Sequence, residues 1–570
     1  MSTRSDPGGP AREFDFSTVN VNSQLRIGHV TNTTAQRRAD NDTTSDVSQT
    51  CDDSARIACH GYVSAMGTTV QGTASGSEGN AVPGFPPTLP DGVLAILKRD
   101  CPTCALVAPV VARLVAEGII AAVYSQDDPA FPDGVADVVD DRQLAVSFHL
   151  DLDTVPTLVR VVDGAEVGRT VGWSVESWSS FTNTDLASAF PGIAAYRPGC
   201  GSKTQDLGMP ETLAIRFGRT PLRARRVQLA SAEDEAEAMY ARGWSDGLPV
   251  VAPTEERVLR MLSGTRRQPH EFVAIVPPNL VECTVEKVAI NAVMAGCLPE
   301  YLPVVLTAVE AACTASFNAH GLLATTYFAG PVMIVNGPIA KAIGMNSGVN
   351  VFGQGNRANS TIGRALQLVI RNVGGGLPGG VDRATLGNPG KVGFCFAESE
   401  EAERAAGWQT LAEERGVPVG TSAITLFPGE GPRGVVDQKS RTADSLVRTF
   451  AACLRSVGHP KLPLGFDAIV AVSPEHLRTF AAEGWDRARL RSELFALLQL
   501  PGAEIAEGAG GIAEGVPMSL AGSTLPKFRD SGLLFVHCGG DAGMFSAIIG
   551  GWANGATGSE PITREITPWL

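Results

Sequence analysis

The sequence predicts an α/β protein in which two folded regions follow a disordered tail. From residue 89 onward, apolar runs of strand length alternate with amphipathic runs of helix length, a pattern typical of a sheet covered by helices. Hydrophobic residues make up 44% of the 570 positions and charged residues 19%, an ordinary globular composition. Residues 1–88 are instead rich in Ser, Thr, Asn, Asp and Gly, without a hydrophobic period. They cannot bury enough apolar surface to offset chain entropy, so we expect them to be disordered.

Charge and hydropathy argue against several classes of partner. The net charge is −14 and no dense basic patch occurs, so nucleic acid is not an expected partner. No apolar run reaches about 18 residues, so no membrane partner is expected either. The N-terminus lacks the apolar core of a signal peptide, which makes a cytoplasmic location the expectation.

Eleven cysteines are scattered along the chain without the spacing of a small disulfide-bonded domain. In a reducing compartment most of them should be plain buried thiols. Cys51 and Cys59 lie in the tail. They are either a regulatory thiol pair or, more commonly, incidental thiols.

The first folded region, residues 89–192, is expected to run in the order β-α-β-α-β-β-α. "DGVLAILKRD" is a strand, a helix begins at "CPTC", and "IIAAVYSQDD" is a second strand. "VADVVDDRQLAVSFHL" predicts a helix that leads into a loop. "VPTLVRVVDGAEVGRTVGW" predicts two strands joined by a turn at Asp163-Gly164. "SVESWSSFTNTDLASAF" predicts a closing helix capped by its first serine.

Residues 193–230 are predicted to be an irregular connector, and residues 231–570 a larger α/β domain with a mostly buried sheet. A division of this domain into two subdomains near 402–440 is left open. Its predicted strands are "EFVAIVP", "GPVMIVNGP", "GFDAIVAVS" and "SGLLFVHC". Its predicted helices are "SAEDEAEAMYARGW", "VEKVAINAVMAGC", "YLPVVLTAVEAACT", "STIGRALQLVIRNV" and "SPEHLRTFAAEGW".

Cys101 and Cys104 are spaced as a redox pair, half a metal site or two buried thiols. At a helix N-terminus, the dipole and the free amide groups lower the pKa of the first thiol, which then attacks disulfides. The second thiol resolves the mixed disulfide. A zinc site would need a second ligand pair, and no other C-x-x-C or H-x₃₋₅-H occurs. The pattern favours the redox pair over a structural pair.

Residues of about 89–192 also resemble a thioredoxin-fold domain, over about a fifth of the chain. The redox motif joins strand to helix, Pro109 matches the family's helix-kinking proline, and the last hairpin has the family's glycines at Gly164 and Gly172. Val155-Pro156-Thr157 resembles the cis-proline element, which faces the dithiol and binds extended substrate chain. The resemblance implies that Cys101 attacks, Cys104 resolves and Pro156 shapes the docking site. It also implies a thiol reductant or reductase as partner.

The resemblance has departures. Asp100 stands where the family usually has Trp, and proline follows Cys101 rather than preceding Cys104. The buried acid expected in the preceding strand is not evident. A negative Asp100 should oppose thiolate formation, so we expect a dedicated rather than a general reductase.

Most of residues 235–400, and more weakly the chain up to "FSAIIGGW", resemble the UGSC-type (seleno)protein group or its companions. The matching runs are "TVEKVAINAVMAGCLPEYLPVV", "MNSGVNVFGQGNRANSTIGRAL" and "TLGNPGK". The motif that names the group is absent, because Cys200-Gly201-Ser202 is followed by Lys203. The resemblance implies no particular chemistry.

Two loops of the large domain are candidates for binding a small anionic substrate. In "GWSDGLPVVAPT", Asp246 follows Trp244 and Ser245, in either a gating loop or a capped turn. The loop "NSGVNVFGQGNRANSTIGRAL" precedes a helix, and its amides and guanidinium could hold a carboxylate or phosphate. The residues concerned are Asn346, Asn350, Asn356, Arg357 and Asn359.

Two further segments carry reactive groups. In "TLGNPGKVGFCFAESEE", Lys391 is a candidate counter-charge for a substrate carboxylate, Glu398 is a candidate acid or base, and Cys395 more often belongs to the core. In "LLFVHCGGDAGMFSAIIGGW", a buried strand runs into His537, Cys538 and Asp541, followed by a helix containing Ser546. The first three are candidate catalytic residues, with His537 activating a thiol or a water. The alternative is that Cys538 is a buried strand residue and the glycines only turn the chain. His320 is an isolated candidate that is more often structural.

The favoured function is a thiol-dependent oxidoreductase. The CPTC domain would serve a catalytic large domain acting on a small anionic or sulfur-containing substrate. The expected cofactor is only the redox-active disulfide Cys101–Cys104, with no metal. The alternative is a redox-sensing protein that binds a ligand or partner without catalysis. A zinc-thiolate enzyme has little support.

Overall fold

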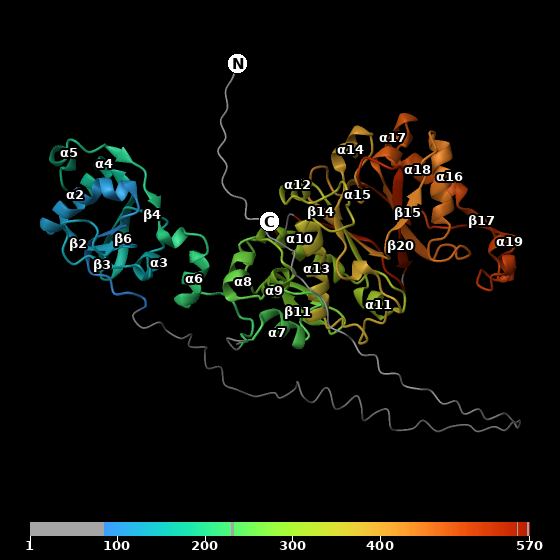
Figure 1. The fold of residues 1–570 in the computed structure, drawn as a ribbon, viewed down its shortest axis with the longest axis horizontal. Helices are drawn as coiled ribbons and strands as arrows, with labels where there is room; N and C mark the ends of the chain where they lie inside the picture. The colour runs from blue at the N-terminus through green and yellow to red at the C-terminus, as the bar shows by residue number, and fades with distance from the viewer. Residues whose placement is uncertain (1–84, 228, 230–232, 556, 567–568, 570) are drawn as a thin grey trace, which may run out of the picture. The chain divides into compact units, whose positions relative to one another are not determined.

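The computed structural model describes residues 85–570 except 228, 230–232, 556, 567–568 and 570. Nearly all of the predicted tail, with Cys51 and Cys59, lies outside the described residues. The described chain is a mixed α/β structure with several sheets (Figure 1). We call residues 85–217 the dithiol domain and residues 235–570 the large domain.

The dithiol domain contains a five-stranded sheet in the order β3-β2-β1-β5-β6. β1 pairs in parallel with β2 and antiparallel with β5, and β5 forms an antiparallel hairpin with β6. The hairpin turns at Asp163 and Gly164, which both have positive φ, as the Asp-Gly pair predicts. The strands are β1 Gly92–Leu97, β2 Ile120–Ser125, β3 Val139–Asp140, β5 Thr157–Val162 and β6 Ala165–Val171.

The helices of this domain are α2 Pro102–Ala116, α3 Ala145–His149, α4 Val175–Thr182 and α5 Leu186–Ala189. Ser174 caps α4, as predicted. The long helix expected from "VADVVDDRQLAVSFHL" is wrong: only its end is helical, as α3, and its beginning pairs as β3. The buried carboxylate of Asp141 accepts the backbone N–H groups of Val146 and Ser147, so the helix starts only there.

The expectation of an irregular connector is also wrong for much of residues 193–230. β8 Tyr196–Arg197 pairs with β7 Trp173–Ser174, and β9 Cys200–Gly201 pairs with β4 Thr154–Val155. The short 3₁₀ helix η2 Lys203–Gln205 and α6 Met209–Arg216 follow. The strands β8 and β9 are two residues long, too short for a hydrophobic period to reveal them.

The large domain is built on an eight-stranded sheet. Six strands follow the order β13-β12-β14-β20-β16-β19, with β15 added to β20 and β21 to β14. The two halves of the sheet meet where Gly429 of β14 faces Gly551 of β20. The strands are β12 Gly330–Asn336, β13 Cys395–Ala397, β14 Ala423–Gly429, β15 Arg433–Val436, β16 Phe466–Val472, β19 Leu533–His537, β20 Phe545–Ala553 and β21 Ile562–Glu565.

Two small antiparallel pairs complete the strands of this domain: β10 Phe272–Val276 with β11 Val281–Thr284, and β17 Gln499–Pro501 with β18 Thr524–Pro526. All the strands predicted for this domain are present. The prediction of a helix that contains Ser546 is wrong, because residues 545–553 form β20. β20 lies inside the sheet, between β14 and β16, where a buried apolar run is extended rather than helical.

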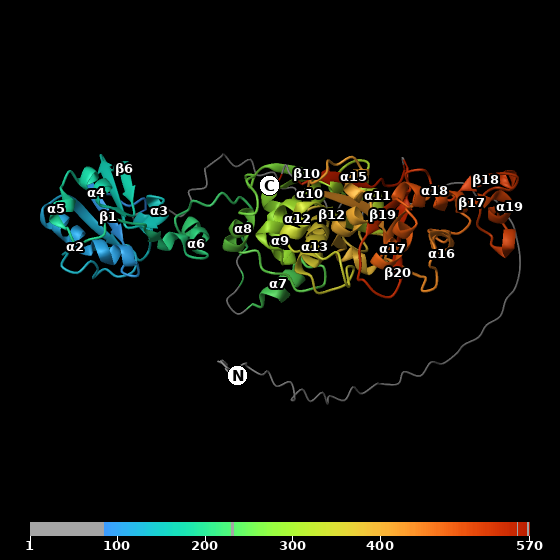
Figure 2. The same ribbon diagram turned by 90° about the horizontal axis from the view of Figure 1, so that it is seen from above.

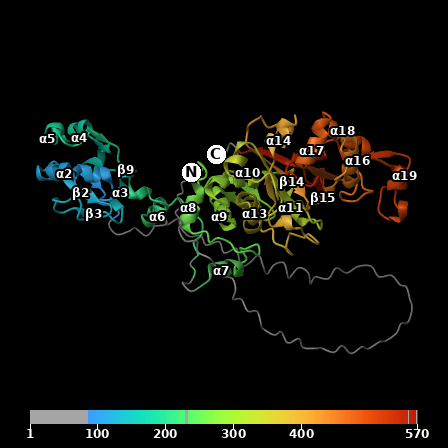
Figure 3. The ribbon, with the colours of Figure 1, turned by 45° about the horizontal axis from the view of Figure 1, so that its top comes forward.

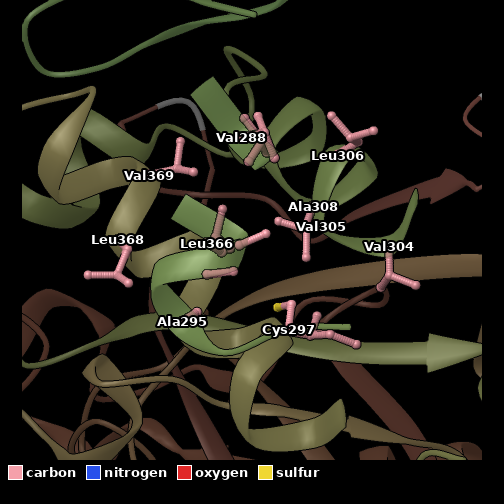
Figure 4. Close-up of a cluster of buried hydrophobic side chains, with 14 of the residues drawn as sticks. Val288, Ala295, Cys297, Val304, Val305, Leu306, Ala308, Leu366, Leu368 and Val369 are labelled. Carbon is pink, nitrogen blue, oxygen red and sulfur yellow. The ribbon is translucent and has the colours of Figure 1, made fainter. Parts of the chain in front are cut away.

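The principal core of the large domain lies among the two apolar helices α9 Val285–Ala295 and α10 Leu302–Ala312 and the apolar face of α13 Arg357–Asn372. α9 and α13 lie side by side (Figure 2). Val288, Val305 and Leu366 come together from the three helices (Figure 4). α16 Ala443–Leu454 and α18 Arg487–Leu497 lie beside one another and pack in a second core with β16 and β19 (Figure 3).

The remaining helices are α7 Glu235–Ala241, α8 Glu255–Leu262, α11 Ala319–Ala324, α12 Pro338–Ala342, α14 Glu400–Ala405, α15 Leu411–Glu414, α17 Pro474–Ala482 and α19 Gly502–Ile505. Over the part of the chain that the structure describes, none of the helices combines the length and the apolar character needed to cross a membrane.

Candidate functional site: a cluster of three thiols

The predicted redox motif lies where β1 ends and α2 begins. Cys101 is the N-cap of α2, and its Sγ accepts the backbone N–H of Cys104 at 3.3 Å. Pro102 occupies the first helical position, where a missing N–H costs nothing. Cys101 is 1% exposed and Cys104 is fully buried. The structure contains both thiols without a bond between them.

The two thiols have opposite acidities. A hydrogen bond from Cys104 lowers the pKa of Cys101 to about 5 against the opposing effect of burial, and Cys200 and the amides of Thr103 and Cys104 contribute. Burial, followed by the same contact with Cys101, raises the pKa of Cys104 far above its usual range. Cys101 is therefore a thiolate near neutral pH while Cys104 keeps its proton. Asp100, expected to oppose this ionisation, is exposed and does not prevent it.

The strand that leads into β5 lies against the first thiol. The Val155–Pro156 bond is cis, and the carbonyl oxygen of Val155 is 3.7 Å from Cys101 Sγ. Pro109 lies within α2, as the sequence predicts. The predicted residues Cys101, Cys104 and Pro156 are therefore brought together by β1, α2 and the turn before β5.

A third thiol, Cys200, belongs to the same cluster. In the β4–β9 ladder, Cys200 faces Val155, the residue whose carbonyl lies against Cys101. Cys200 packs against the buried cluster that contains Cys101, and burial, followed by the nearby Cys101, raises the pKa of Cys200. It is only partly buried. The sequence showed this cysteine within Cys200-Gly201-Ser202, but nothing in the spacing to Cys101 indicated that they would meet.

Within the described ranges, no three His, Cys, Asp or Glu side chains are grouped so that they could hold a metal ion.

In the large domain, two of the predicted segments meet around a cavity of about 250 Å³. The loop residues 350–353 form one side, and Cys538, Gly539 and Ser546 line another. The backbone N–H of Gly539 donates to the carbonyl of Ser347 at 2.9 Å, which joins the end of β19 to this loop.

The polar side chains of the loop mostly hold the loop itself. Asn346 and Asn359 exchange side-chain and backbone hydrogen bonds, and Asn356 caps α13. Asn350 donates to the carbonyl of Gln354, and Arg357 donates to the carbonyl of Gly296. Only Asn350 of these five lines the cavity. The predicted anion site is thus a hydrogen-bonded scaffold, and its side chains do not converge on one point.

The other predicted charges are paired inside the domain. Arg364 binds Asp246 through two 2.7 Å contacts, and burial of Asp246 is outweighed by this pairing, which lowers its pKa. Lys391 pairs with Asp382 at 2.7 Å. Ser245 accepts the N–H of Gly247 and donates to Leu248, so the "GWSDG" segment is a capped turn.

Glu398, the candidate acid or base, is buried, and its carboxylate oxygen lies 2.6 Å from the guanidinium of the buried Arg487. It is therefore part of an internal ion pair. Arg487 also contacts Glu403 and Glu414. Cys395 lies in the core, where burial raises its pKa. His320 is exposed on α11.

His537, Cys538 and Asp541 do not form a catalytic group. His537 is buried and donates from Nδ1 to the carbonyl of Val472 at 2.8 Å. Burial raises the pKa of Cys538 and lowers that of His537. Asp541 is exposed and pairs with Arg478.

Ser546, by contrast, has a partner that the sequence did not indicate. Its Oγ is 2.7 Å from Nδ1 of His476, and Nε2 of the same ring is 3.1 Å from the carbonyl of Asp437. Because a carbonyl only accepts, Nε2 holds the proton and Nδ1 accepts from the hydroxyl. This polarises a hydroxyl at the cavity wall. His476 and Ser546 are 70 residues apart, so no local motif connects them.

Comparisons with protein-family models, with curated proteins and with solved structures give no match for this chain.

Proposed function

We propose that the protein is a thiol–disulfide oxidoreductase whose reacting group is the Cys101 thiolate. The observation that carries the proposal is the placement of Cys101 at the N-cap of α2, with a pKa of about 5, beside a resolving thiol that keeps its proton. An ionised, hydrogen-bonded sulfur next to a protonated one is the arrangement that disulfide exchange requires.

The exchange balances with a disulfide RS–SR′ as oxidant. The Cys101 thiolate attacks one sulfur, the S–S bond breaks, and R′S⁻ leaves with the electron pair. Cys104 then attacks Cys101 Sγ, the bond between Cys101 and SR breaks, and the departing RS⁻ takes the proton of Cys104 as the Cys101–Cys104 disulfide forms. The substrate gains two electrons, and an external thiol reductant returns them to the protein.

The arrangement of the dithiol domain supports a thioredoxin-like fold for it. The strand order β2-β1-β5-β6, the helix after β1 and the closing helix α4 follow the order that the resemblance implies. The cis bond before Pro156 lies beside Cys101, where the resemblance places the docking element.

We infer further that the large domain is the part that binds the small substrate. Support comes from the cavity of about 250 Å³ and from the Ser546 hydroxyl, polarised by His476, at its wall. This volume lies just below the roughly 300–1,000 Å³ of typical ligand pockets, so the cavity would take only a small molecule. A cytoplasmic location would supply the reductant.

The proposal is tested by turnover of the full-length chain, with hydroxyethyl disulfide as substrate and dithiothreitol as reductant. Replacing Cys101 by Ser should reduce the rate by on the order of 10³-fold, because the attacking sulfur is lost. With both neighbouring thiols removed, in a Cys104→Ser, Cys200→Ser variant, a mixed disulfide should stay on Cys101, found by peptide mass mapping.

The matched control is Cys453→Ser, which removes a partly buried thiol on α16 of the large domain, away from the cavity, and should leave the rate unchanged. Full turnover in the Cys101→Ser variant would rule the proposal out. Redox-dependent ligand binding without any turnover of the unmodified chain would favour a sensor instead.

A further inference from the structure

The segment that follows α4 and α5 lies beside the pair Cys101 and Cys104. We call residues 196–202 the return segment. Its first part, β8, pairs with β7, and its second part, β9, pairs with β4. Ser202 continues the second ladder by donating its N–H to the carbonyl of Asp153 at 2.8 Å. The return segment is thus a strand added to the chain just before cis-Pro156.

Specific contacts fasten the return segment over the motif itself. The Thr103 hydroxyl, within the CPTC motif, donates to the carbonyl of Pro198 at 2.6 Å. Lys98 donates to the carbonyl of Gly201 at 2.7 Å. Gly199 fits where no side chain could, since a Cβ there would lie 2.8 Å from the carbonyl oxygen of Val155. These contacts hold Cys200 at Cys101.

The exposures of the thiols give Cys200 an advantage as a resolving group. Cys104 is fully buried, and its raised pKa makes its thiolate costly to form. Cys200 is partly exposed and can lose its proton to solvent more easily. Cys101 is 1% exposed although it is ionised, and the return segment lies beside it, since Cys200 is paired with Val155, whose carbonyl oxygen lies against Cys101 Sγ.

We propose that Cys200 is a third exchange thiol, which forms a disulfide with Cys101 in competition with Cys104 and so fastens the return segment over the site. The proposal rests on the thiol–disulfide function proposed above. The oxidant is a low-molecular-mass disulfide RS–SR′. After Cys101 has formed Cys101–SR and released R′S⁻, Cys200 attacks Cys101 Sγ. The Cys101–SR bond breaks, RS⁻ takes the proton of Cys200, and a Cys101–Cys200 bond results.

In the Cys101–Cys200 disulfide state, Cys104 keeps its proton, and Cys101 is covalently bound to the return segment. Reopening requires a second exchange: either Cys104 displaces Cys200 from Cys101, or an external thiol reductant does so. The site therefore has two oxidised states. In the Cys101–Cys104 state the return segment is held only by hydrogen bonds, and in the Cys101–Cys200 state it is also held by a covalent bond.

The test uses the reduced full-length chain and oxidised glutathione, followed by alkylation of the remaining thiols and peptide mass mapping. In the Cys104→Ser variant we expect a Cys101–Cys200 disulfide in most chains. In the matched Cys104→Ser, Cys200→Ser variant we expect glutathione to stay on Cys101. A Cys104→Ser chain that keeps glutathione on Cys101 while Cys200 is alkylated would overturn the proposal.

The unmodified chain provides a test that does not depend on the folding of a variant. Samples quenched with acid at early times should contain the Cys101–Cys200 disulfide beside the Cys101–Cys104 disulfide. If only Cys101–Cys104 appears at every time, the role of Cys200 is refuted while the oxidoreductase function stands. If Cys101 acquires neither glutathione nor a disulfide, both proposals fail.

Discussion

The two domains differ in what folding does with the groups that the sequence singles out. In the dithiol domain, Cys101 and Cys104 lie in contact and Cys101 remains an ionised group with a low pKa. In the large domain, charges such as Asp246 and Lys391 are committed to partners inside the protein. A charged or nucleophilic residue in a loop therefore indicates a functional site only if the folded protein does not pair that group internally.

The largest effect expected from this comparison concerns the buried charges of the large domain. Replacing Arg487 by Met would leave Glu398 and Glu403 buried without their cation. Removing one partner from a buried charge cluster typically costs about 3–5 kcal/mol in the free energy of unfolding. Urea unfolding of the full-length chain measures this loss, while Cys101 chemistry should be unchanged.

The control for this experiment is Arg448→Met, which removes an exposed pair with Asp444 on α16. Exposed pairs of this kind are screened by solvent and salt, so this replacement should leave the free energy of unfolding nearly unchanged. If the Arg487 variant were as stable as this control and had lost activity, Arg487 would belong to a site and the contrast between the domains would be wrong.

A smaller effect is expected in the loop first interpreted as an anion site. The side chain of Asn356 accepts the backbone N–H of Asn359 at 3.0 Å and caps α13. Its replacement by Ala should lower the stability by about 1 kcal/mol, as the loss of an N-cap does. Thermal unfolding with and without phosphate measures both roles. Phosphate stabilisation that is present in the parent chain and lost in the variant would restore the anion-site interpretation.

The sequence was sufficient where the signal is local. The CPTC motif, the Asp163-Gly164 turn, the Ser174 cap and the four strands predicted for the large domain follow from neighbouring residues, and the structure has each of them. The α/β class follows from the same alternation of apolar runs.

The sequence was insufficient where the outcome depends on distant partners. Cys200 reaches Cys101 through two-residue ladders, and Ser546 reaches His476 across 70 residues. Similarly, the local pattern of residues 545–553 predicts a helix. They form the strand β20 because β14 and β16 pair with them on both sides. Pairing across such separations leaves no local hydrophobic period.

The ionisation of Cys101 is the property on which the account depends most. Its pKa of about 5 lies below the 9.0 of an ordinary thiol, because hydrogen bonds to the thiolate outweigh its burial. A lowered pKa stabilises the folded, reduced chain. That stabilisation is complete above about pH 9 and is lost as the pH falls through about 5.

The most direct measurement is the thiolate absorbance of the reduced full-length chain near 240 nm, recorded from acid to neutral pH beside the Cys101→Ser variant. It needs no reagent to reach the buried sulfur. We expect one ionisation step with a midpoint near pH 5 that is missing in the variant. A parent chain without any step below about pH 7 would contradict the assignment of Cys101 as the attacking thiolate.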